Sequence, residues 1–449
     1  MRKLFGTDGI RAVAGQAPLD AKTIYAIGLA LAHQLKDKSP QPSILLGIDT
    51  RESGPWIAAT LTAGLVDGGA TVQSAGVITT PAIAYLARKH GFSAGVVISA
   101  SHNPWQDNGI KVFGGDGYKL PDTTELRIEE EIFRRLESIS APDPATLSAP
   151  SVEPMFRADY ESFLLSAVPG LSLNGLSLVL DCANGAASAI APELFARLGG
   201  SVHFTHVKPN GRNINEHCGA LHPEIVAAET SAQHANIGVT FDGDADRALF
   251  ADTRGKVVNG DGVLLLAARD LRARGMLNGN VVVATTMSNM GLEAALRRDA
   301  ITMLRAPVGD KYVLEMMQAN SASIGGEQSG HILFPHLATT GDGLLTALVV
   351  LDTVRRSGKP LHELIADLKV FPQIIVNVRV REKRPLEKIS EVATRIRAAE
   401  EELRDNGRVV IRYSGTEPLA RVMIEAESEE AMRRHAEAIA TAIRNALGA

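Results

Sequence analysis

Short runs of apolar residues alternate along the chain with longer segments in which apolar positions recur at helical spacing. The runs at residues 43–48, 95–99, 176–180, 236–241 and 281–284 are rich in Val and Ile and predict strands. The segments 57–66, 193–198, 262–273 and 344–354 lie between them and predict helices. Continuous apolar strands are buried on both faces, as in parallel sheets joined by crossover helices. The pattern therefore predicts an α/β fold.

The character of the chain changes near residues 360–371. Beyond this point the pattern predicts a strand at 374–380, an amphipathic helix at 386–403, strands at 408–413 and 421–425, and a final helix. Such an order is typical of a separate α+β domain. Residues 138–154 indicate another boundary, because they contain several Pro, Ser and Ala residues and few large apolar ones.

Composition narrows the class of protein. A chain of 449 residues suggests about three domains, and the proportions of hydrophobic (45%) and charged (22%) residues are those of a soluble globular protein. The formal net charge is -5, so no general basic field would hold nucleic acid, and an anionic ligand needs a local pocket.

The compartment is predicted from the same sequence. The N-terminus lacks the features of a signal peptide, and no run of roughly 18 apolar residues predicts a membrane span. The two cysteines, Cys182 and Cys218, are too few for a disulfide-stapled secreted scaffold and are expected to be free thiols. These features predict a cytoplasmic protein with no membrane partner.

Three carboxylates follow the predicted strand at 236–241, namely Asp242, Asp244 and Asp246. If the backbone stays extended there, the three side chains share one face and repel one another. A hard divalent cation would relieve the repulsion, and oxygen-only ligands favour Mg²⁺ or Ca²⁺ over Zn²⁺. A calcium-binding loop is disfavoured, since Arg247 and Thr253 stand where such a loop has Gly and Glu. The alternative is a solvated acidic turn.

The predicted strand at 95–99 runs into the polar turn Ser99-Ala100-Ser101-His102-Asn103-Pro104. Ser101 is flanked by donors that suit a phosphate ester: backbone amides, His102 and, farther along, Lys111. The Gly-x-Ser-x-Gly elbow of a hydrolase nucleophile is absent. Taken alone, the segment is more typical of an ordinary turn, because these residues favour turns for local hydrogen-bonding reasons.

Residues 411–418, in the predicted α+β domain, contain side chains that could bind a phosphate group, and we call this segment the phosphate clamp. Arg412 and the nearby Arg421 offer planar donor forks, and the turn Ser414-Gly415-Thr416 adds hydroxyls and backbone amides. A plain hairpin turn is the alternative.

Two more segments carry polar side chains suited to a sugar phosphate. The glycine-rich loop at 325–331 contains Glu327, Ser329 and His331, which can bind sugar hydroxyls. The segment 6–11 places Arg11 near the start of the fold, where on its own it would be a surface residue.

Taken together and in this order, these segments resemble the α-D-phosphohexomutase superfamily over nearly the whole chain. The resemblance implies three mixed α/β domains and a C-terminal α+β domain around a central active-site cleft. The expected domains are 1–150 with the phosphoserine loop, 151–253 with the metal-binding loop, 254–368 with the sugar-binding loop and 369–449 with the phosphate clamp.

The resemblance also implies roles for individual residues. Ser101 would be the phosphoserine, and Mg²⁺ would be held by Asp242, Asp244, Asp246 and one oxygen of that phosphoserine. Glu327 and Ser329 would hold the sugar. The phosphate that is not reacting would be gripped by Arg412, Ser414, Gly415, Thr416 and Arg421. Further active-site groups, with roles left open, are Arg11, His102, Lys111, Arg247 and His331.

The segments 308–313 and 327–331 resemble the branch of the superfamily that acts on glucosamine phosphates. This implies interconversion of glucosamine 6-phosphate and glucosamine 1-phosphate, with glucosamine 1,6-bisphosphate as intermediate and activator, in the supply of UDP-N-acetylglucosamine. Lys111 or His331 would accept the proton of the attacking hydroxyl if local cations lower its pKa. Ala12 and Lys311 depart from residues usual in relatives.

Three other functions stay open at this point. They are the same chemistry on mannose or glucose phosphates, a non-catalytic sensor of sugar phosphates, and a metallophosphatase that uses water as acceptor. The oligomeric state is also open, with a homodimer as one option.

Overall fold

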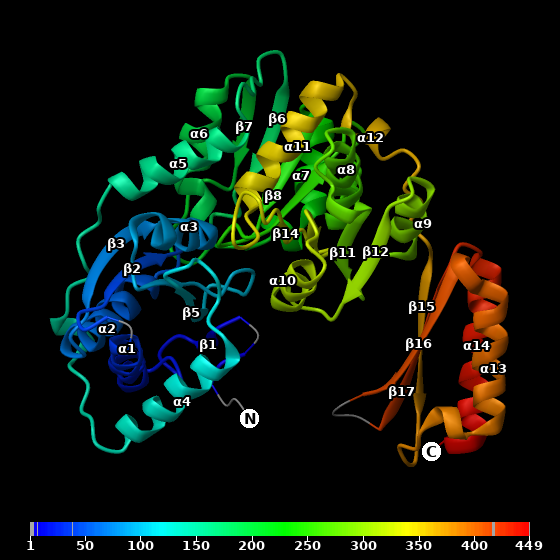
Figure 1. The fold of residues 1–449 in the computed structure, drawn as a ribbon, viewed down its shortest axis with the longest axis horizontal. Coiled ribbons are helices and arrows are strands. Elements are labelled where there is room, and N and C mark those ends of the chain that lie inside the picture. Colours follow the sequence, from blue (N-terminus) through cyan, green and yellow to red (C-terminus); the bar gives the residue numbers. More distant parts are fainter. Residues whose placement is uncertain (1–3, 7, 38, 415–417, 449) are drawn as a thin grey trace. The chain divides into compact units, whose positions relative to one another are not determined.

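The computed structural model describes residues 4–6, 8–37, 39–414 and 418–448. Two compact units make up the chain: Met1–Thr286 with Arg305–Leu364, and Met287–Leu304 with Ile365–Ala449. Figure 1 shows helices and strands mixed along the whole chain, which confirms the α/β class.

The first sheet has the strand order β1-β5-β4-β2-β3. Its strands β2, β3 and β4 are parallel, whereas β5 is antiparallel to β4 and β1 is antiparallel to β5. Helices α1, α2 and α4 pack on one face and α3 on the other. The elements are β1 (Ile10–Val13), α1 (Ala21–Lys36), β2 (Ser43–Ile48), α2 (Gly54–Asp67), β3 (Thr71–Val77), α3 (Thr80–His90), β4 (Ala94–Ile98), β5 (Asp107–Gly114) and α4 (Asp122–Leu136).

The second sheet repeats this arrangement with the order β10-β9-β8-β6-β7. Strands β6, β7 and β8 are parallel, and β9 is antiparallel to β8. The elements are α5 (Met155–Ala167), β6 (Ser177–Asp181), α6 (Ala191–Leu198), β7 (Ser201–Thr205), α7 (Pro223–Ala232), β8 (Ile237–Phe241), β9 (Ala248–Ala251) and β10 (Val257–Val258).

A third sheet has the order β12-β11-β13-β14. Two of its helices begin at capping residues: the side chain of Asn259 accepts from the first turn of α8, and that of Asp342 from the first turn of α11. The elements are α8 (Gly260–Ala273), β11 (Val281–Thr285), β12 (Thr302–Ala306), α10 (Asp310–Ala319), β13 (Gly325–Gly326), β14 (Ile332–Leu333), α11 (Gly343–Ser357) and α12 (Leu361–Leu364).

The second unit contains an antiparallel sheet with the order β15-β17-β16. Figure 1 shows α13 and α14 together on one side of this sheet, and their apolar faces form its core. The elements are α9 (Met290–Arg298), β15 (Gln373–Arg379), α13 (Ser390–Leu403), β16 (Gly407–Tyr413), β17 (Leu419–Ala426) and α14 (Glu429–Leu447).

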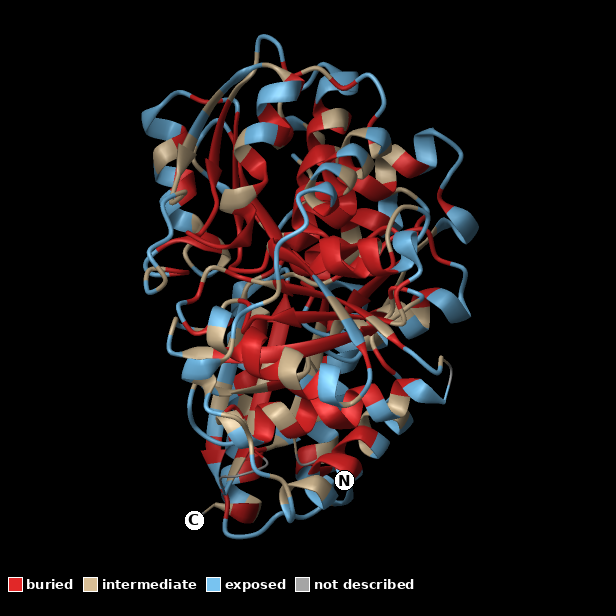
Figure 2. Ribbon diagram, turned by 90° about the vertical axis from the view of Figure 1, so that its left-hand side faces the viewer, coloured by how far each residue is buried: buried red, intermediate tan, exposed pale blue. Residues whose placement is uncertain are grey.

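Most predicted elements are present, with small differences at their ends. Predicted strands of the α/β region differ from the observed ones by at most one residue at either end. Helices begin one to three residues earlier than predicted, because Gly and Pro are tolerated in a first turn although they are poor in a helix interior. Figure 2 shows that buried residues concentrate in the strands and on the inner faces of helices.

The pattern missed some antiparallel strands and placed one helix start too early. The predicted strands at 43–48 and 95–99, and those at 176–180 and 236–241, pair in parallel. Strands β5 and β9 pair antiparallel with β4 and β8, because the connections between them are too short for a crossover. The helix predicted at 386–403 begins at Ser390, after a short 3₁₀ turn at Leu386–Lys388.

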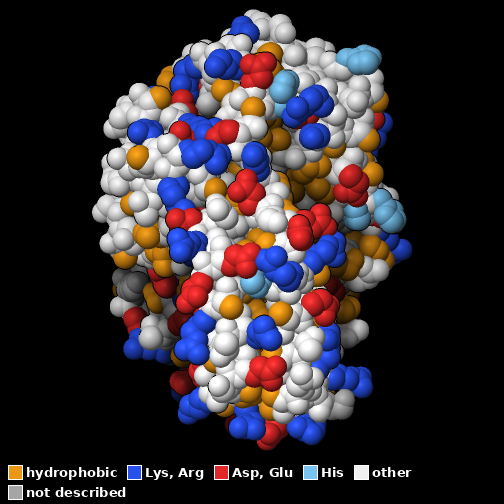
Figure 3. Space-filling model, turned by 90° about the vertical axis from the view of Figure 1, so that its right-hand side faces the viewer, with side chains coloured by type: hydrophobic (Ala, Val, Ile, Leu, Met, Phe, Trp, Pro, Cys, Tyr) orange, Lys and Arg blue, Asp and Glu red, His pale blue; other side chains and the backbone are white. Residues whose placement is uncertain are grey.

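The surface charge, the helices and the cysteines can be compared with what the sequence predicts. On the face shown in Figure 3, basic and acidic side chains are interspersed. Among the residues that the structure describes, no helix combines the length and apolar character needed to cross a bilayer. Cys182 and Cys218 are both buried free thiols.

Candidate functional site

Ser101 lies in the tight connection between β4 and β5, with a left-handed backbone (φ 52°). Its hydroxyl donates a 2.5 Å hydrogen bond to Oδ2 of Asp242, which follows β8 in the second sheet. The ring Nδ1 of His102 lies 3.3 Å from the same hydroxyl. The structure thus brings the predicted phosphate carrier into contact with the predicted metal-binding loop.

The loop at residues 242–246 is a turn, and the prediction of an extended backbone was wrong. Ala245 is left-handed (φ 55°), and its amide donates to the carbonyl of Asp242 at 3.0 Å. The turn arises because this segment joins two antiparallel strands. Oxygen atoms of Asp242, Asp244 and Asp246 nevertheless lie within 4.8 Å of one another.

The electrostatics of these three carboxylates fit a bound cation. All are buried, and burial together with the charges of Asp246 and Asp244 raises the pKa of Asp242. Within the described part of the chain, Oδ1 of Asp244 and Oδ1 of Asp246 are buried without a hydrogen-bond partner. Because all the donors are carboxylate oxygens, the group fits a hard divalent metal ion.

Lys111, on β5, is held by the carboxylates around it. Its ammonium group lies 2.7 Å from Asp244, 2.8 Å from Asp8 and 3.7 Å from Asp246. Burial alone would lower the pKa of Lys111, but the charges of Asp244 and Asp8 raise it. Thr80, at the start of α3, donates a 2.5 Å hydrogen bond to the same Asp244 oxygen.

The expectation that local cations lower the pKa of Lys111 or His331 was wrong. His331 lies 3.6 Å from both Asp246 and Asp310. Burial opposes its charge, yet Asp246 raises the pKa of His331 to about 9. The nearest charges to both groups are carboxylates, so both hold their protons in this arrangement.

His102 has the opposite environment. Burial, followed by the charges of Arg247 and Arg11, lowers the pKa of His102 to about 4. Its imidazole is therefore neutral near pH 7.

Arg11 is fixed in place, although the sequence alone favours a surface residue. It pairs with Asp8, and its Nη1 donates to the carbonyl of Ala100 at 3.2 Å and to Oδ1 of Asn103 at 3.4 Å. Ala12 does not disturb this arrangement, because it lies within β1 opposite Asn108.

A cavity of about 480 Å³ opens beside these groups. Lys119 bridges two of its acidic residues, with Nζ 2.7 Å from both Asp8 and Asp310. Ser101 is itself buried beside it. The cavity is lined by Leu4, Gly6, Asp8, Gly9, Arg11, His102, Lys119, Asp246, Arg247, Val308, Gly309, Asp310, Glu327 and His331.

The predicted sugar-binding loop supplies part of this wall. Glu327 and His331 line the cavity, whereas Ser329 is exposed and is not among the lining residues. The side chain of Glu327 accepts a 3.1 Å hydrogen bond from the amide of Gly309. Gln328 donates to Asp261 at 3.1 Å, which ties the loop to the start of α8.

The predicted phosphate clamp lies in the second unit. Arg412 on β16 is directly opposite Arg421 on β17, so both side chains point to the same face of the sheet. This is the face away from the core, since Ala420 and Val422 are buried on the other side. The amide of Ser414 donates to Leu419 at 2.8 Å. Gly415 and Thr416 lie outside the described residues.

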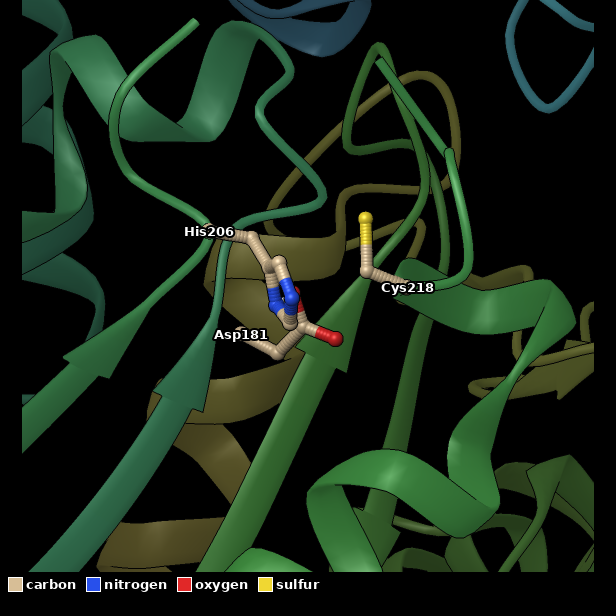
Figure 4. Close-up of side chains that lie close together, drawn as sticks. All are labelled: Asp181, His206 and Cys218. Carbon is tan, nitrogen blue, oxygen red and sulfur yellow. The ribbon is translucent and has the colours of Figure 1, made fainter. Parts of the chain in front are cut away.

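A second group of metal-binding residue types occurs at Asp181, His206 and Cys218 (Figure 4). The carboxylate of Asp181 is already saturated. Its Oδ1 accepts from the amide of Ala183 and faces Nδ1 of His206 at 3.0 Å, and its Oδ2 accepts from Gly219 and Thr240 at 2.8 and 3.1 Å. A carboxylate occupied in this way holds neighbouring loops together.

Sequence reasoning missed several residues of the site. Asp8, Lys119 and Asp310 form its charge network, and Thr80 holds Asp244. Asp8 could have been found, because it precedes Arg11 in the same polar segment, and Asp310 belongs to a segment used for the resemblance. Lys119 and Thr80 offered no signal, since their role depends on contacts made by other parts of the chain.

Known protein families and relatives match this chain over nearly its whole length. Profiles of the phosphoglucomutase/phosphomannomutase family match residues 2–138 (alpha/beta/alpha domain I), 160–255 (domain II), 259–371 (domain III) and 375–442 (C-terminal domain). Phosphoglucosamine mutase of Koribacter versatilis is 58% identical, with 100% of this chain and 98% of the relative covered. The phosphoglucosamine mutase of Solibacter usitatus is 53% identical, with 100% and 99% covered.

Solved structures share the fold. A phosphoglucomutase/phosphomannomutase family protein from Burkholderia thailandensis has a TM-score of 0.77 at 24% identity, covering 98% of this chain and 97% of its own. Aspergillus fumigatus N-acetylphosphoglucosamine mutase, in complex with GlcNAc-6P and magnesium, has a TM-score of 0.65 at 20% identity, covering 99% and 96%. The chain therefore belongs to the phosphoglucomutase/phosphomannomutase family, as a phosphohexomutase of the phosphoglucosamine mutase group.

Proposed function

We propose that this enzyme interconverts glucosamine 6-phosphate and glucosamine 1-phosphate with Ser101 as the phosphate carrier. The observation that carries the proposal is the 2.5 Å hydrogen bond between the Ser101 hydroxyl and Asp242, within a cluster of three buried carboxylates beside a polar cavity. The names of its relatives, which are phosphoglucosamine mutases, favour glucosamine phosphates over mannose or glucose phosphates.

The reaction has two half-reactions, and the serine is used in both. In the first, the C1 hydroxyl of glucosamine 6-phosphate attacks the phosphorus held on Ser101, the bond from phosphorus to the serine oxygen breaks, and the hydroxyl proton passes to a base. The product is glucosamine 1,6-bisphosphate. After reorientation of the sugar, the serine oxygen attacks the phosphorus at C6, the bond from phosphorus to the C6 oxygen breaks, and that oxygen takes up a proton from the protonated base. This releases glucosamine 1-phosphate and restores the phosphoserine.

The chain supplies groups for alignment and for charge neutralisation, which are the main needs of phosphoryl transfer. Asp242, Asp244 and Asp246 would hold Mg²⁺ together with an oxygen of the phosphoserine. When bound, Mg²⁺ neutralises charge on the transferring phosphoryl group. Arg11, Arg247 and Lys119 bring further positive charge to the cavity wall.

Binding of the sugar and of its second phosphate is assigned to two places. Glu327 and Ser329 hold the sugar hydroxyls, and Arg412, Ser414, Gly415, Thr416 and Arg421 hold the phosphate that is not reacting. A clamp on a separate domain suits a mechanism in which the sugar turns round between the half-reactions.

Lys111 and His331 are the candidates for the proton acceptor, and either can take this role only after giving up the proton that it holds in this arrangement. His102 is a further active-site group. The division into domains 1–150, 151–253, 254–368 and 369–449 stays a prediction of the sequence. A cytoplasmic location and a homodimer stay predictions of the sequence.

The proposal is tested by Ser101→Ala, assayed for interconversion with added glucosamine 1,6-bisphosphate. We expect turnover to be lost, because the phosphoryl group has no carrier. Ser166→Ala on the exposed face of α5 is the matched control and should behave as wild type. Wild-type turnover in Ser101→Ala would end the assignment.

Two further measurements on the wild-type enzyme separate a mutase from a non-catalytic sensor and from a metallophosphatase. They are the intact mass, which detects a covalently bound phosphoryl group, and the amount of free phosphate released. A mutase carries a phosphoryl group on Ser101 and releases little free phosphate. A sensor would lack the phosphoryl group, and a metallophosphatase would release phosphate in step with substrate loss.

A further inference from the structure

A buried arginine lies directly behind the Ser101 turn. Arg51 follows β2 and is 1% exposed, which makes it one of the largest fully buried side chains in the described chain. It is not among the residues that line the cavity. A guanidinium in this position needs a specific set of acceptors, because burying an unpaired charge is costly.

The acceptors of Arg51 are the backbone carbonyls of the turn that carries Ser101. Its Nη2 donates to the carbonyls of Ser101 and Asn103, both at 2.9 Å, and its Nη1 donates to that of Pro104 at 2.6 Å. The planar fork of one side chain thus holds three carbonyls of a four-residue stretch. Its Nε donates to Oδ2 of Asp49 at 2.9 Å, which fixes the plane of the guanidinium.

Asp49 connects Arg51 to the other side of Ser101. The hydroxyl of Ser99 donates to Oδ2 of Asp49 at 2.6 Å and accepts from the amide of Ser101 at 2.9 Å. Both the amide and the carbonyl of Ser101 are therefore tied to one buried ion pair. The loop of the second sheet adds one more anchor, because Asn215 donates to the carbonyl of Ser101 at 2.9 Å.

This network holds the backbone of Ser101 in a conformation that the residue would not keep by itself. Its left-handed backbone is strained for a residue with a side chain, and such a conformation persists only where the surroundings over-determine it. A phosphorylated Ser101 would also place negative charge beside buried carboxylates. The serine oxygen must stand at one position both when it loses the phosphoryl group and when it attacks to regain one.

We infer that Arg51 is a positioning residue that fixes the Ser101 oxygen for both half-reactions by holding the carbonyls of its turn. The inference rests on the proposed function of Ser101 and adds a residue that touches neither substrate nor cavity. It predicts a defect in kcat with little change in KM, because the sugar-binding wall stays intact.

The test uses Arg51→Lys and Arg51→Ala in the full-length enzyme, with glucosamine 6-phosphate and excess glucosamine 1,6-bisphosphate. Lys keeps the buried positive charge, but it lacks the planar guanidinium that donates to the three carbonyls of the turn. We expect kcat to fall about 100-fold in Arg51→Ala, the effect of a small displacement of a reacting atom, and less in Arg51→Lys, with KM unchanged in both. Added guanidinium should restore part of the turnover of Arg51→Ala.

Arg212→Ala is the matched control, since Arg212 pairs with Glu52 of the same loop from the exposed side. A thermal melt of each variant checks that it is folded. If Arg51→Ala does not fold, the kinetics of Arg51→Lys decide the test. Wild-type kcat in a folded variant, or a defect confined to KM, overturns the inference. Either result leaves the serine assignment standing, because only an active Ser101→Ala contradicts that.

Discussion

The ammonium group of Lys111 lies 2.7 Å from a carboxylate oxygen of Asp244, and both side chains are almost completely removed from solvent. The contact joins β5 of the first sheet to the loop that follows β8 of the second. The connection from β4 to β5 approaches the same loop so closely that a Cβ at Gly243 would stand 2.5 Å from the carbonyl oxygen of Ser101. The ion pair therefore joins the two segments at the point where the phosphate carrier meets the metal-binding carboxylates.

Replacing Lys111 by Met leaves Asp244 buried next to other carboxylates without its main counter-charge. Removing one partner of a buried ion pair costs about 3–5 kcal/mol. We expect Lys111→Met to lower the melting temperature and to abolish turnover, as measured by thermal denaturation and by the mutase assay.

The double variant Lys111→Met/Asp244→Asn separates the two effects. It removes both charges, so the melting temperature should recover toward wild type while turnover stays absent. A double variant as unstable as Lys111→Met would show that the loss of stability does not come from the uncompensated charge.

Divalent metal should stabilise the folded enzyme through the three carboxylates. A ligand present at 100 times its Kd and bound only by the folded state adds about 2.7 kcal/mol of stability. We expect Mg²⁺ to raise the melting temperature of the wild type and of Glu137→Gln, an exposed control at the end of α4. Asp246→Asn should show a much smaller rise. An equal rise in all three proteins would place the binding site elsewhere.

Arg412→Ala should weaken substrate binding more than it slows chemistry. Hydrogen bonds to charged groups contribute about 1.5–3 kcal/mol, so the loss of the fork should raise KM about 10- to 100-fold. Steady-state kinetics with glucosamine 6-phosphate measure the change. Arg395→Ala, on the exposed face of α13, should leave KM unchanged. A normal KM in Arg412→Ala would remove Arg412 from the clamp.

Stability should depend on pH through His206. Its hydrogen bond with Asp181 raises the pKa of the imidazole above the ordinary value of about 6.5. The resulting stabilisation is complete below pH 6.5 and is lost as the pH rises through the folded-state value. His206→Asn keeps a residue type that tolerates the left-handed backbone (φ 48°).

We therefore expect the difference in melting temperature between wild type and His206→Asn to be larger at pH 6 than at pH 9. His33→Asn, on an exposed position of α1, is the control and should show the same difference at both pH values. A difference for His206→Asn that does not change with pH would mean that the charge of His206 contributes nothing.

The candidate site was predictable where a motif sits at a strand end. Asp242, Asp244, Asp246 and Ser101 were found because each follows an apolar strand, and polar residues at such ends gather at one edge of a sheet. The prediction of an extended acidic loop failed, because nothing local shows that β9 turns back beside β8. The pKa expectations for Lys111 and His331 failed for a similar reason, since the carboxylates around them come from distant segments.

The sequence by itself determined the α/β class, the α+β domain after residue 371, the residue types that can carry phosphate and metal, and the resemblance to the family. These properties follow from periodicity and from local order along the chain. The resemblance already implied that Ser101 and Asp242 lie together, and the structure shows the hydrogen bond between them. Only the tertiary structure decided that Lys119 bridges Asp8 and Asp310 and that Arg51 holds the serine turn. Each of these contacts joins segments far apart in sequence, and burial gives them strength through the loss of competing water.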